Sequence, residues 1–223
     1  MSGADQAGQE TAAALDPAHE SPTPPRRHGT GYTAVGVDLG EWYLAVAAPA
    51  GREPDEALVV SGEEVREQYA ALVGATHALE EATFDTTRGQ SQLVAAVWES
   101  MQAEISDGVE QVVEYARQFP TPLLVLEDLY YSEVALWEQR TSRELGAWLL
   151  PAFREALVVR ANEVGLPVAN VDPKGSTQQC HVCSEAGEVR EKTLLCTTPD
   201  CPVEEVCRDR SAALTIAQRA IGE

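Results

Sequence analysis

The chain has 223 residues, with 16 Lys or Arg against 36 Asp or Glu, so its formal net charge is −20 at pH 7. This length is sufficient for one good-sized core and a small satellite domain. No apolar run approaches the length needed to cross a bilayer, and residues 1–30 lack the apolar core of a signal peptide. The composition therefore excludes an integral membrane protein and predicts a soluble, cytoplasmic one.

The acidic balance also bears on solvent and partners. Only Lys174 and Lys192 are lysines, and Ala and Val are abundant, which together suggest a halophilic protein kept soluble in molar salt. At about 1 M salt the Debye length is roughly 3 Å, so net charge argues only weakly against a nucleic-acid partner. In a low-salt organism it would argue strongly against one, because phosphate contacts by cations dominate that affinity.

The N-terminal part begins with residues 1–30, rich in Ala, Gly, Glu and Pro, which are predicted to be a disordered tail. Residues 32–48 predict two short strands joined by a turn at Leu39 to Glu41. Asp38 then falls at the end of a buried strand, where a carboxylate needs a cation, a hydrogen-bond donor or water. A simple role as a turn residue is the alternative.

The middle of the chain predicts a third strand at 57–61 and two amphipathic helices, separated by a break at 84–90, before a run of strand length. That run, residues 122–129, reads as a central strand that ends on Glu127 and Asp128. The period of two sends these acids to opposite faces, so only one of them can share a site with Asp38.

A capping box at Thr141 and Glu144 predicts the start of another helix. We expect Pro151 to kink or split it. A short strand at 168–171 follows and leads into the last fifty residues.

Two cysteine pairs, separated by twelve residues, dominate that last segment. The spacing Cys-x2-Cys and Cys-x4-Cys suits two knuckles that hold one tetrahedral structural Zn2+, the expected ligands being Cys180, Cys183, Cys196 and Cys201. A disulfide framework is the alternative, disfavoured by the absence of a signal peptide. His181 lies between two ligands and is interpreted as a bystander, and Cys207 as a small buried hydrophobe.

Three acids remain after this survey. Asp209 opens an Ala-rich helical run at the C-terminus, where its ordinary role would be that of a helix N-cap. If the first and fourth strands are neighbours and the last helix packs beside them, Asp209 would meet Asp38 and Glu127. Three converging carboxylates repel one another unless cations neutralise them, and hard oxygen ligands suit Mg2+ or Mn2+. Such a site can hold two metals that act on a phosphodiester.

Four motifs in order resemble a known family: Gly36-Val-Asp38-Leu-Gly40, Leu126-Glu127-Asp128-Leu129, the cysteine pairs, and Asp209-Arg-Ser-Ala-Ala213. They are similar to the RuvC-type motifs and inserted zinc ribbon of the TnpB (OrfB) proteins of insertion sequences, relatives of the compact type V CRISPR nucleases. The leader at 165–177 is also similar. The resemblance covers residues 31 to 221.

The resemblance implies an α/β, RNase H-like (RuvC-type) mixed sheet flanked by helices, with a small zinc ribbon inserted before the last helix. The corresponding division is a tail at 1–30, a core at 31–175, the ribbon at 176–205 and the last helix at 206–223. It further implies that Asp38, Glu127 and Asp209 are catalytic carboxylates binding Mg2+ or Mn2+, and that the activity is RNA-guided cleavage of DNA.

The sequence departs from the family in three ways. Only residues 1–30 precede the core, where relatives carry a region that holds guide RNA and target duplex. The helical region is acidic where relatives tend to be basic, and Ser211 replaces the usual Asn.

These departures leave three hypotheses open: a DNA endonuclease that relies on a guide RNA or a separate targeting protein, a catalytically silent DNA-binding zinc-ribbon protein, or a truncated transposon remnant. The expected nucleic-acid contacts are Arg190, Lys192, Arg208 and Arg210.

Overall fold

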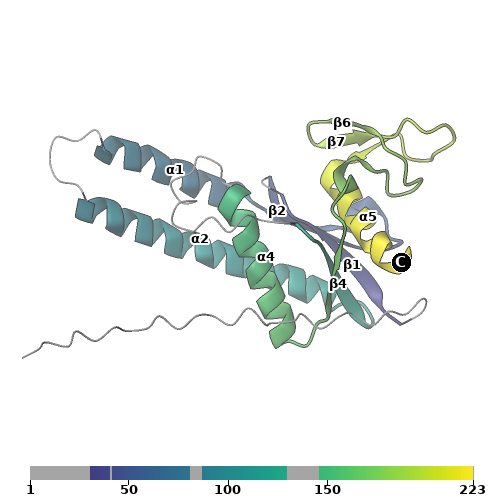
Figure 1. The fold of residues 1–223 in the computed structure, drawn as a ribbon, viewed down its shortest axis with the longest axis horizontal. Coiled ribbons are helices and arrows are strands. Elements are labelled where there is room, and N and C mark those ends of the chain that lie inside the picture. Colours follow the sequence, from purple (N-terminus) through teal and green to yellow (C-terminus); the bar gives the residue numbers. More distant parts are fainter. Residues whose placement is uncertain (1–30, 41, 81–86, 130–145, 223) are drawn as a thin grey trace, which may run out of the picture.

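The structure is a computed structural model that describes residues 31–40, 42–80, 87–129 and 146–222 (Figure 1). The predicted tail, the capping box at 141–144 and the beginning of the predicted break at 84–90 lie outside these residues. No helix of the described residues is long and apolar enough to span a bilayer.

A five-stranded mixed sheet forms the centre of the molecule, in the order β3-β2-β1-β4-β5. Strand β2 is antiparallel to both of its neighbours, whereas β1, β4 and β5 run parallel to one another. The expected neighbourhood of the first and fourth strands is confirmed, with Val37 opposite Leu126. The strands are β1 (Thr33–Asp38), β2 (Tyr43–Pro49), β3 (Leu58–Ser61), β4 (Pro122–Glu127) and β5 (Val168–Val171).

Alternate side chains of the central strands enter two separate cores, as the period of two requires. Val35 and Leu126 belong to the larger core, which includes residues of α2 and α4. Ala34 and Val125 belong to a smaller one with Ile216 of α5. Figure 1 shows α2 and α4 apart from α5, with the sheet between them. The helices are α1 (Glu63–Glu80), α2 (Thr87–Ala116), α4 (Gly146–Glu163) and α5 (Arg208–Gly222), with short 3-10 turns η1 (Pro54–Glu56) and η2 (Ser176–Gln178).

Helices α1 and α2 run together away from the sheet as a long hairpin (Figure 1). Helix α2 begins at Thr87, inside the predicted break, because nothing in Thr-Arg-Gly-Gln is incompatible with a first helical turn. Helix α4 continues through Pro151, so the predicted split is wrong. Pro151 lies near the N-terminal end, where its missing N–H removes only one of the first intrahelical hydrogen bonds. Arg160 of α4 pairs with both carboxylate oxygens of Glu110 of α2, at 2.7 and 3.1 Å.

A second sheet of three short antiparallel strands precedes α5, and its middle strand buries Leu194 completely. The strands are β6 (Glu188–Arg190), β7 (Thr193–Leu195) and β8 (Glu205–Cys207). Strand β8 runs directly into α5 at Arg208, so the ribbon and the last helix share a boundary without a linker. The predicted architecture, a mixed sheet flanked by helices with a small cysteine-bearing sheet before the last helix, is confirmed.

Candidate functional site

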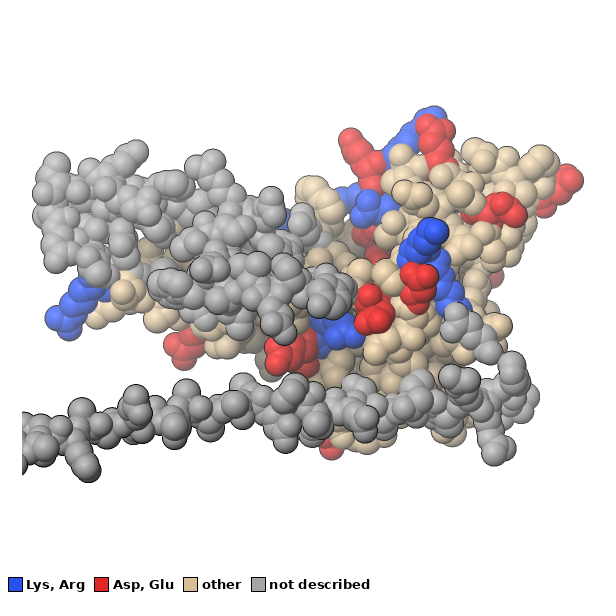
Figure 2. Space-filling view, in the orientation of Figure 1, with Lys and Arg blue, Asp and Glu red and all other residues tan. Residues whose placement is uncertain are grey.

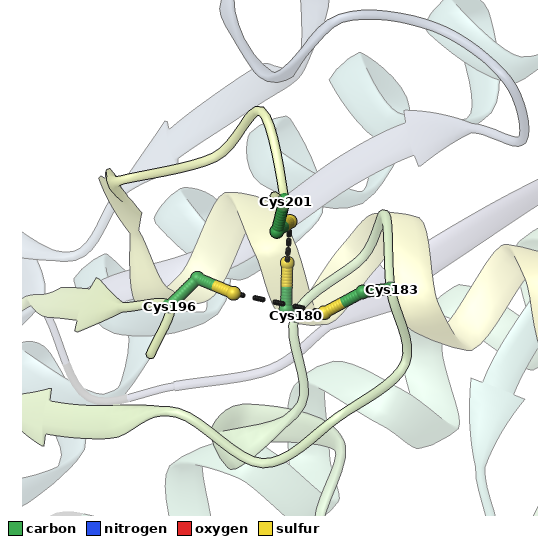
Figure 3. Close-up of side chains that lie close together, drawn as sticks. All are labelled: Cys180, Cys183, Cys196 and Cys201. Carbon is green, nitrogen blue, oxygen red and sulfur yellow. Dashed lines mark hydrogen bonds between the residues drawn. The ribbon is translucent and has the colours of Figure 1, made fainter. Parts of the chain in front are cut away.

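The four predicted zinc ligands come together in the small sheet and its loops. Their Sγ atoms all lie within 4.8 Å of one another, and the side chains point to a common centre (Figure 3). Cys180 lies 3.9 Å from Cys201, and Cys183 lies 3.6 Å from Cys196, sulfur to sulfur. Tetrahedral zinc with Zn–S bonds of about 2.3 Å requires sulfurs about 3.8 Å apart. The cluster therefore fits one structural Zn2+.

The surroundings of the sulfurs also favour metal binding. Cys183 Sγ lies 3.5 Å from the Thr198 hydroxyl oxygen, and this contact, followed by the Glu185 backbone amide, lowers the pKa of Cys183 to about 6. A thiolate is therefore available at neutral pH, as a zinc ligand requires. Burial raises the pKa of Cys180, the one fully buried member of the cluster.

The first cysteine knuckle is attached to α5 by its intervening residue. His181 is buried, its N–H donates to Ser211 Oγ over 3.3 Å, and the Ser211 hydroxyl donates to the Gln179 carbonyl over 3.2 Å. Gln218 Nε2 donates to the His181 carbonyl over 2.8 Å, two turns further along α5. Burial lowers the pKa of His181, which keeps the ring neutral. The sequence analysis interpreted His181 as a bystander and Ser211 as a difference from the family motif. The only feature of the sequence that could have indicated their contact is that His181 follows Cys180 and Ser211 lies two residues after Asp209.

Two of the three predicted carboxylates lie side by side on the α5 face of the large sheet. The parallel register that pairs Val37 with Leu126 places Asp38 next to Glu127. Glu127 is two residues beyond Val125, whose side chain packs with α5 residues, so the two acids occupy that same face. Both side chains are buried, whereas Asp128 is exposed.

The third carboxylate belongs to the first turn of α5. Asp209 is 3 % exposed and shares a helical stripe with Ala213 and Ala217, which approach the sheet. Arg208 Nε donates to Asp209 Oδ1 over 2.8 Å. A carboxylate near a helix N-terminus is favourable on its own account, so this position explains part of the residue type without a metal.

The pKa of Asp38 reports the proximity of the three acids. Burial raises it well above its ordinary value, and the negative charges of Asp209 and Glu127 raise it further, against the opposing effect of Arg208. Each carboxylate thus disfavours ionisation of Asp38, and a cation between them would reverse that effect.

Glu127 carries the clearest sign of a missing partner. Burial raises its pKa, while a hydrogen bond with the Ser176 side chain and the charge of Arg219 oppose the shift. Its Oε1 atom is nevertheless buried without any hydrogen-bond partner. Burying a carboxylate oxygen without a partner costs free energy. Hard divalent cations such as Mg2+ bind preferentially to oxygen ligands of this kind. The oxygen donors of these carboxylates are of the chemical type that Mg2+ and Mn2+ prefer.

The carboxylates are less tightly gathered than the thiols. Over the described part of the chain, the cysteines form the one group of three or more potential ligands close enough to hold a metal as they stand. One oxygen of Asp209 already pairs with Arg208.

The four expected nucleic-acid contacts are engaged with the protein itself. Arg190 pairs with Glu188 at 3.1 Å, and Arg210 pairs with Asp55 at 2.8 Å. Lys192 lies over the Trp42 ring, and Arg208 holds Asp209. On the face drawn in Figure 2, cations and carboxylates of the described residues are interleaved, and they form no continuous basic patch.

Comparison with known protein families matches residues 152–216 to the domain described as Cas12f1-like, TNB domain. This match spans the four clustered cysteines and Asp209. No curated protein matches the sequence.

Three solved structures share the fold. The Cas12f1–sgRNA–target DNA complex has a TM-score of 0.64 at 13 % identity, covering 83 % of this chain and 50 % of that one. A CRISPR-Cas12f ternary complex has a TM-score of 0.61 at 13 % identity, covering 86 % and 40 %. The mini-RNA-guided endonuclease CRISPR-Cas_phi3 has a TM-score of 0.50 at 15 % identity, covering 85 % and 45 %. The chain thus spans half or less of these proteins' lengths, and at such identities the likeness establishes the fold alone.

Proposed function

We propose that this chain is the RuvC-type core of a divalent-metal-dependent DNA endonuclease, with Asp38, Glu127 and Asp209 as its catalytic carboxylates. The observation that carries the proposal is the unpartnered Glu127 Oε1, buried beside Asp38 on the face that α5 covers. A buried carboxylate oxygen needs a hydrogen-bond donor or a cation, and the described residues offer this atom no donor.

Several residues would contribute to binding the divalent cation. Asp38 and Glu127, from adjacent parallel strands, and Asp209, from α5, would hold Mg2+ or Mn2+, which when bound supplies activation of water and stabilisation of the leaving oxygen. Arg208 orients the Asp209 carboxylate through its 2.8 Å ion pair. Ser176 and Arg219 lower the pKa of Glu127, so they favour the ionised form that binds a cation.

The zinc ribbon is assigned a structural role in this scheme. Its first knuckle contacts Ser211, two residues after Asp209, so an ordered ribbon keeps the first turn of α5 in place. We retain the division into a core at 31–175, a ribbon at 176–205 and a last helix at 206–223. Guide RNA or a separate targeting protein would direct the core to DNA, because the described residues on the face drawn in Figure 2 form no continuous basic patch.

A catalytically silent DNA-binding protein is the second candidate. The looser gathering of the carboxylates favours it, since a binding module does not need them to converge. The two candidates differ in one measurable property, the divalent-dependent cleavage of DNA.

The test is cleavage of labelled single-stranded and duplex DNA in molar KCl with Mg2+ or Mn2+. The wild type is compared with Asp209→Ala and with Asp128→Ala, an exposed acid on the opposite face that serves as the matched control. We expect cleavage by the wild type and by Asp128→Ala, and none by Asp209→Ala. Equal cleavage by all three would point to a contaminating nuclease, and no cleavage with DNA binding intact would favour the silent candidate.

A further inference from the structure

The turn between β1 and β2 presents a large aromatic ring to solvent. Trp42 is 52 % exposed, comparable with Tyr32 at the opposite end of β1, which is 56 % exposed. The backbone of Trp42 is fixed, because its carbonyl accepts from the Gly62 N–H at 3.3 Å and from Arg66 Nη1 at 2.9 Å. The half-exposed indole on this anchored backbone offers a ring face on which a planar group can stack.

Two cations lie over this ring. The Arg66 Cζ atom is 4.8 Å from the ring centroid, and the Lys192 Nζ atom is 4.3 Å from it. Lys192 also lies 5.3 Å from the centroid of the Tyr43 ring. A lysine ammonium on its flexible stem can leave a ring face at small cost when another group covers that face. Lys192 therefore occupies a position that a stacking ligand could take.

The ring is connected to the carboxylate site by two short links, one along the chain and one through hydrogen bonds. Trp42 follows Asp38 by four residues, in the turn that leaves β1. From the other side, the Lys192 carbonyl accepts from the Arg208 N–H at 2.8 Å, and Arg208 pairs with Asp209. These links make Trp42 a candidate to contact a strand whose phosphate lies at the carboxylates.

An open groove of about 760 Å³ is lined by Lys192 and by its neighbour Tyr43, together with Thr193 and Arg210. Carboxylates from Glu53, Asp55 and Glu205 line it as well, and Asp55 already pairs with Arg210. Attraction for phosphate is therefore largely cancelled here. Base stacking is the remaining source of affinity, and unlike phosphate contact it does not depend on releasing counterions.

We propose that Trp42 is a stacking platform for an unpaired nucleobase of the single DNA strand that enters the carboxylate site. The Lys192 ammonium leaves the ring as the base arrives and contacts the neighbouring phosphate. Single-stranded DNA is the ligand because bases in a duplex are already stacked on both faces and offer no free one. This inference rests on the proposed function in taking that strand to be the one cut.

The first measurement is binding of a labelled single-stranded oligonucleotide, by fluorescence anisotropy, in buffer without Mg2+ or Mn2+ and at low and molar KCl. The variants are Trp42→Ala, Trp42→Phe and the matched control Tyr32→Ala. We expect Trp42→Ala to weaken binding about five- to hundredfold at both salt concentrations. Trp42→Phe should weaken binding less. Tyr32→Ala should bind the single strand as tightly as the wild type does, and no variant should change the affinity for duplex DNA.

A second measurement separates stacking from a general structural role. Single abasic sites are moved along the oligonucleotide, and each is tested against the wild type and Trp42→Ala. One abasic position should weaken wild-type binding and have no further effect on Trp42→Ala, because the same contact is already lost. Additive losses at every position would overturn the proposal, as would no effect of Trp42→Ala or no binding of the strand by the wild type.

Failure of this inference is distinguishable from failure of the proposed function, because binding is measured without cleavage. Coupling between Trp42 and one base, without any cleavage, would support the stacking role of Trp42 and contradict the proposed nuclease function. Cleavage and strand binding that are both unchanged in Trp42→Ala would support the nuclease function and contradict the stacking role. Zinc content and circular dichroism of each variant show that it is folded.

Discussion

Gly36 of β1 and Ala213 of α5 are in direct backbone contact. A Cβ atom added at Gly36 would lie closer than 3.0 Å to the Ala213 carbonyl oxygen and to the Ala217 amide nitrogen. Neither atom can move without moving the helix. The separation between β1 and α5, and with it the distance from Asp38 to Asp209, is thus set by the absence of a side chain at one position.

We predict that Gly36→Ala destabilises the protein by roughly 1 to 3 kcal/mol, because the helix must shift away from the sheet. Thermal unfolding measures the loss. Gly40→Ala is the matched control, since the nearest atom to its added Cβ would be the Tyr43 carbonyl oxygen at an ordinary 3.5 Å. Equal stability of the two variants would contradict the close contact.

Zinc should be held by four of the five cysteines. Metal analysis of the purified wild type is expected to give about one Zn2+ per chain, and Cys196→Ser to give close to none. Cys207→Ser is the control, because this thiol lies in β8 outside the clustered sulfurs, and it should keep its zinc. We also expect faster amide exchange in β6 to β8 after zinc loss. Equal zinc loss in both variants would refute the ligand set.

Asp38 should make the stability of the protein depend on pH and on divalent cations. Burial, Asp209 and Glu127 raise its folded-state pKa above the ordinary 3.8. Below about pH 4 the carboxyl is protonated in both states and has no effect. As the pH rises towards the folded-state pKa, only the unfolded chain releases the proton, so stability falls, and above that pKa the penalty stays constant.

Asp38→Asn removes this penalty, so its stability advantage over the wild type should grow as the pH rises above about 4 and level off above the folded-state pKa of Asp38. The measurement is urea unfolding of zinc-loaded protein at each pH, with and without Mg2+. Mg2+ should stabilise the wild type and not Asp38→Asn. Asp128→Asn is the control, and a pH-independent difference would show that the three charges do not interact as described.

Stability should rise with salt concentration. A net charge of −20 on 223 residues repels itself at low ionic strength, and screening removes that penalty. We expect the melting temperature to increase between about 0.1 and 2 M KCl, and to increase less in sucrose of equal osmolality. A melting temperature that does not change with KCl concentration would contradict the interpretation that the protein is halophilic.

Much of the fold was predictable from local patterns. The strand at 122–127 is a continuous apolar run that ends on Glu127, and the strand at 168–171 has the predicted bounds, because both are short, mainly apolar segments between clear breaks. The mistaken split at Pro151 came from a rule about helix interiors, applied to a residue that the structure places near a helix start. Spacing alone also identified the zinc ligands, since two knuckles require only local geometry.

The sequence by itself determined which residue types stand at the strand ends and knuckles, because alternation, apolar runs and cysteine spacing are local properties. Only the tertiary structure decided which of them meet. The parallel register of β1 and β4 puts Glu127, and not Asp128, beside Asp38. The contact at Gly36 brings Asp209 to the same face, and the ribbon brings Lys192 onto Trp42. These contacts join residues far apart in the chain, and their energies depend on packing and charge that no short stretch of sequence contains.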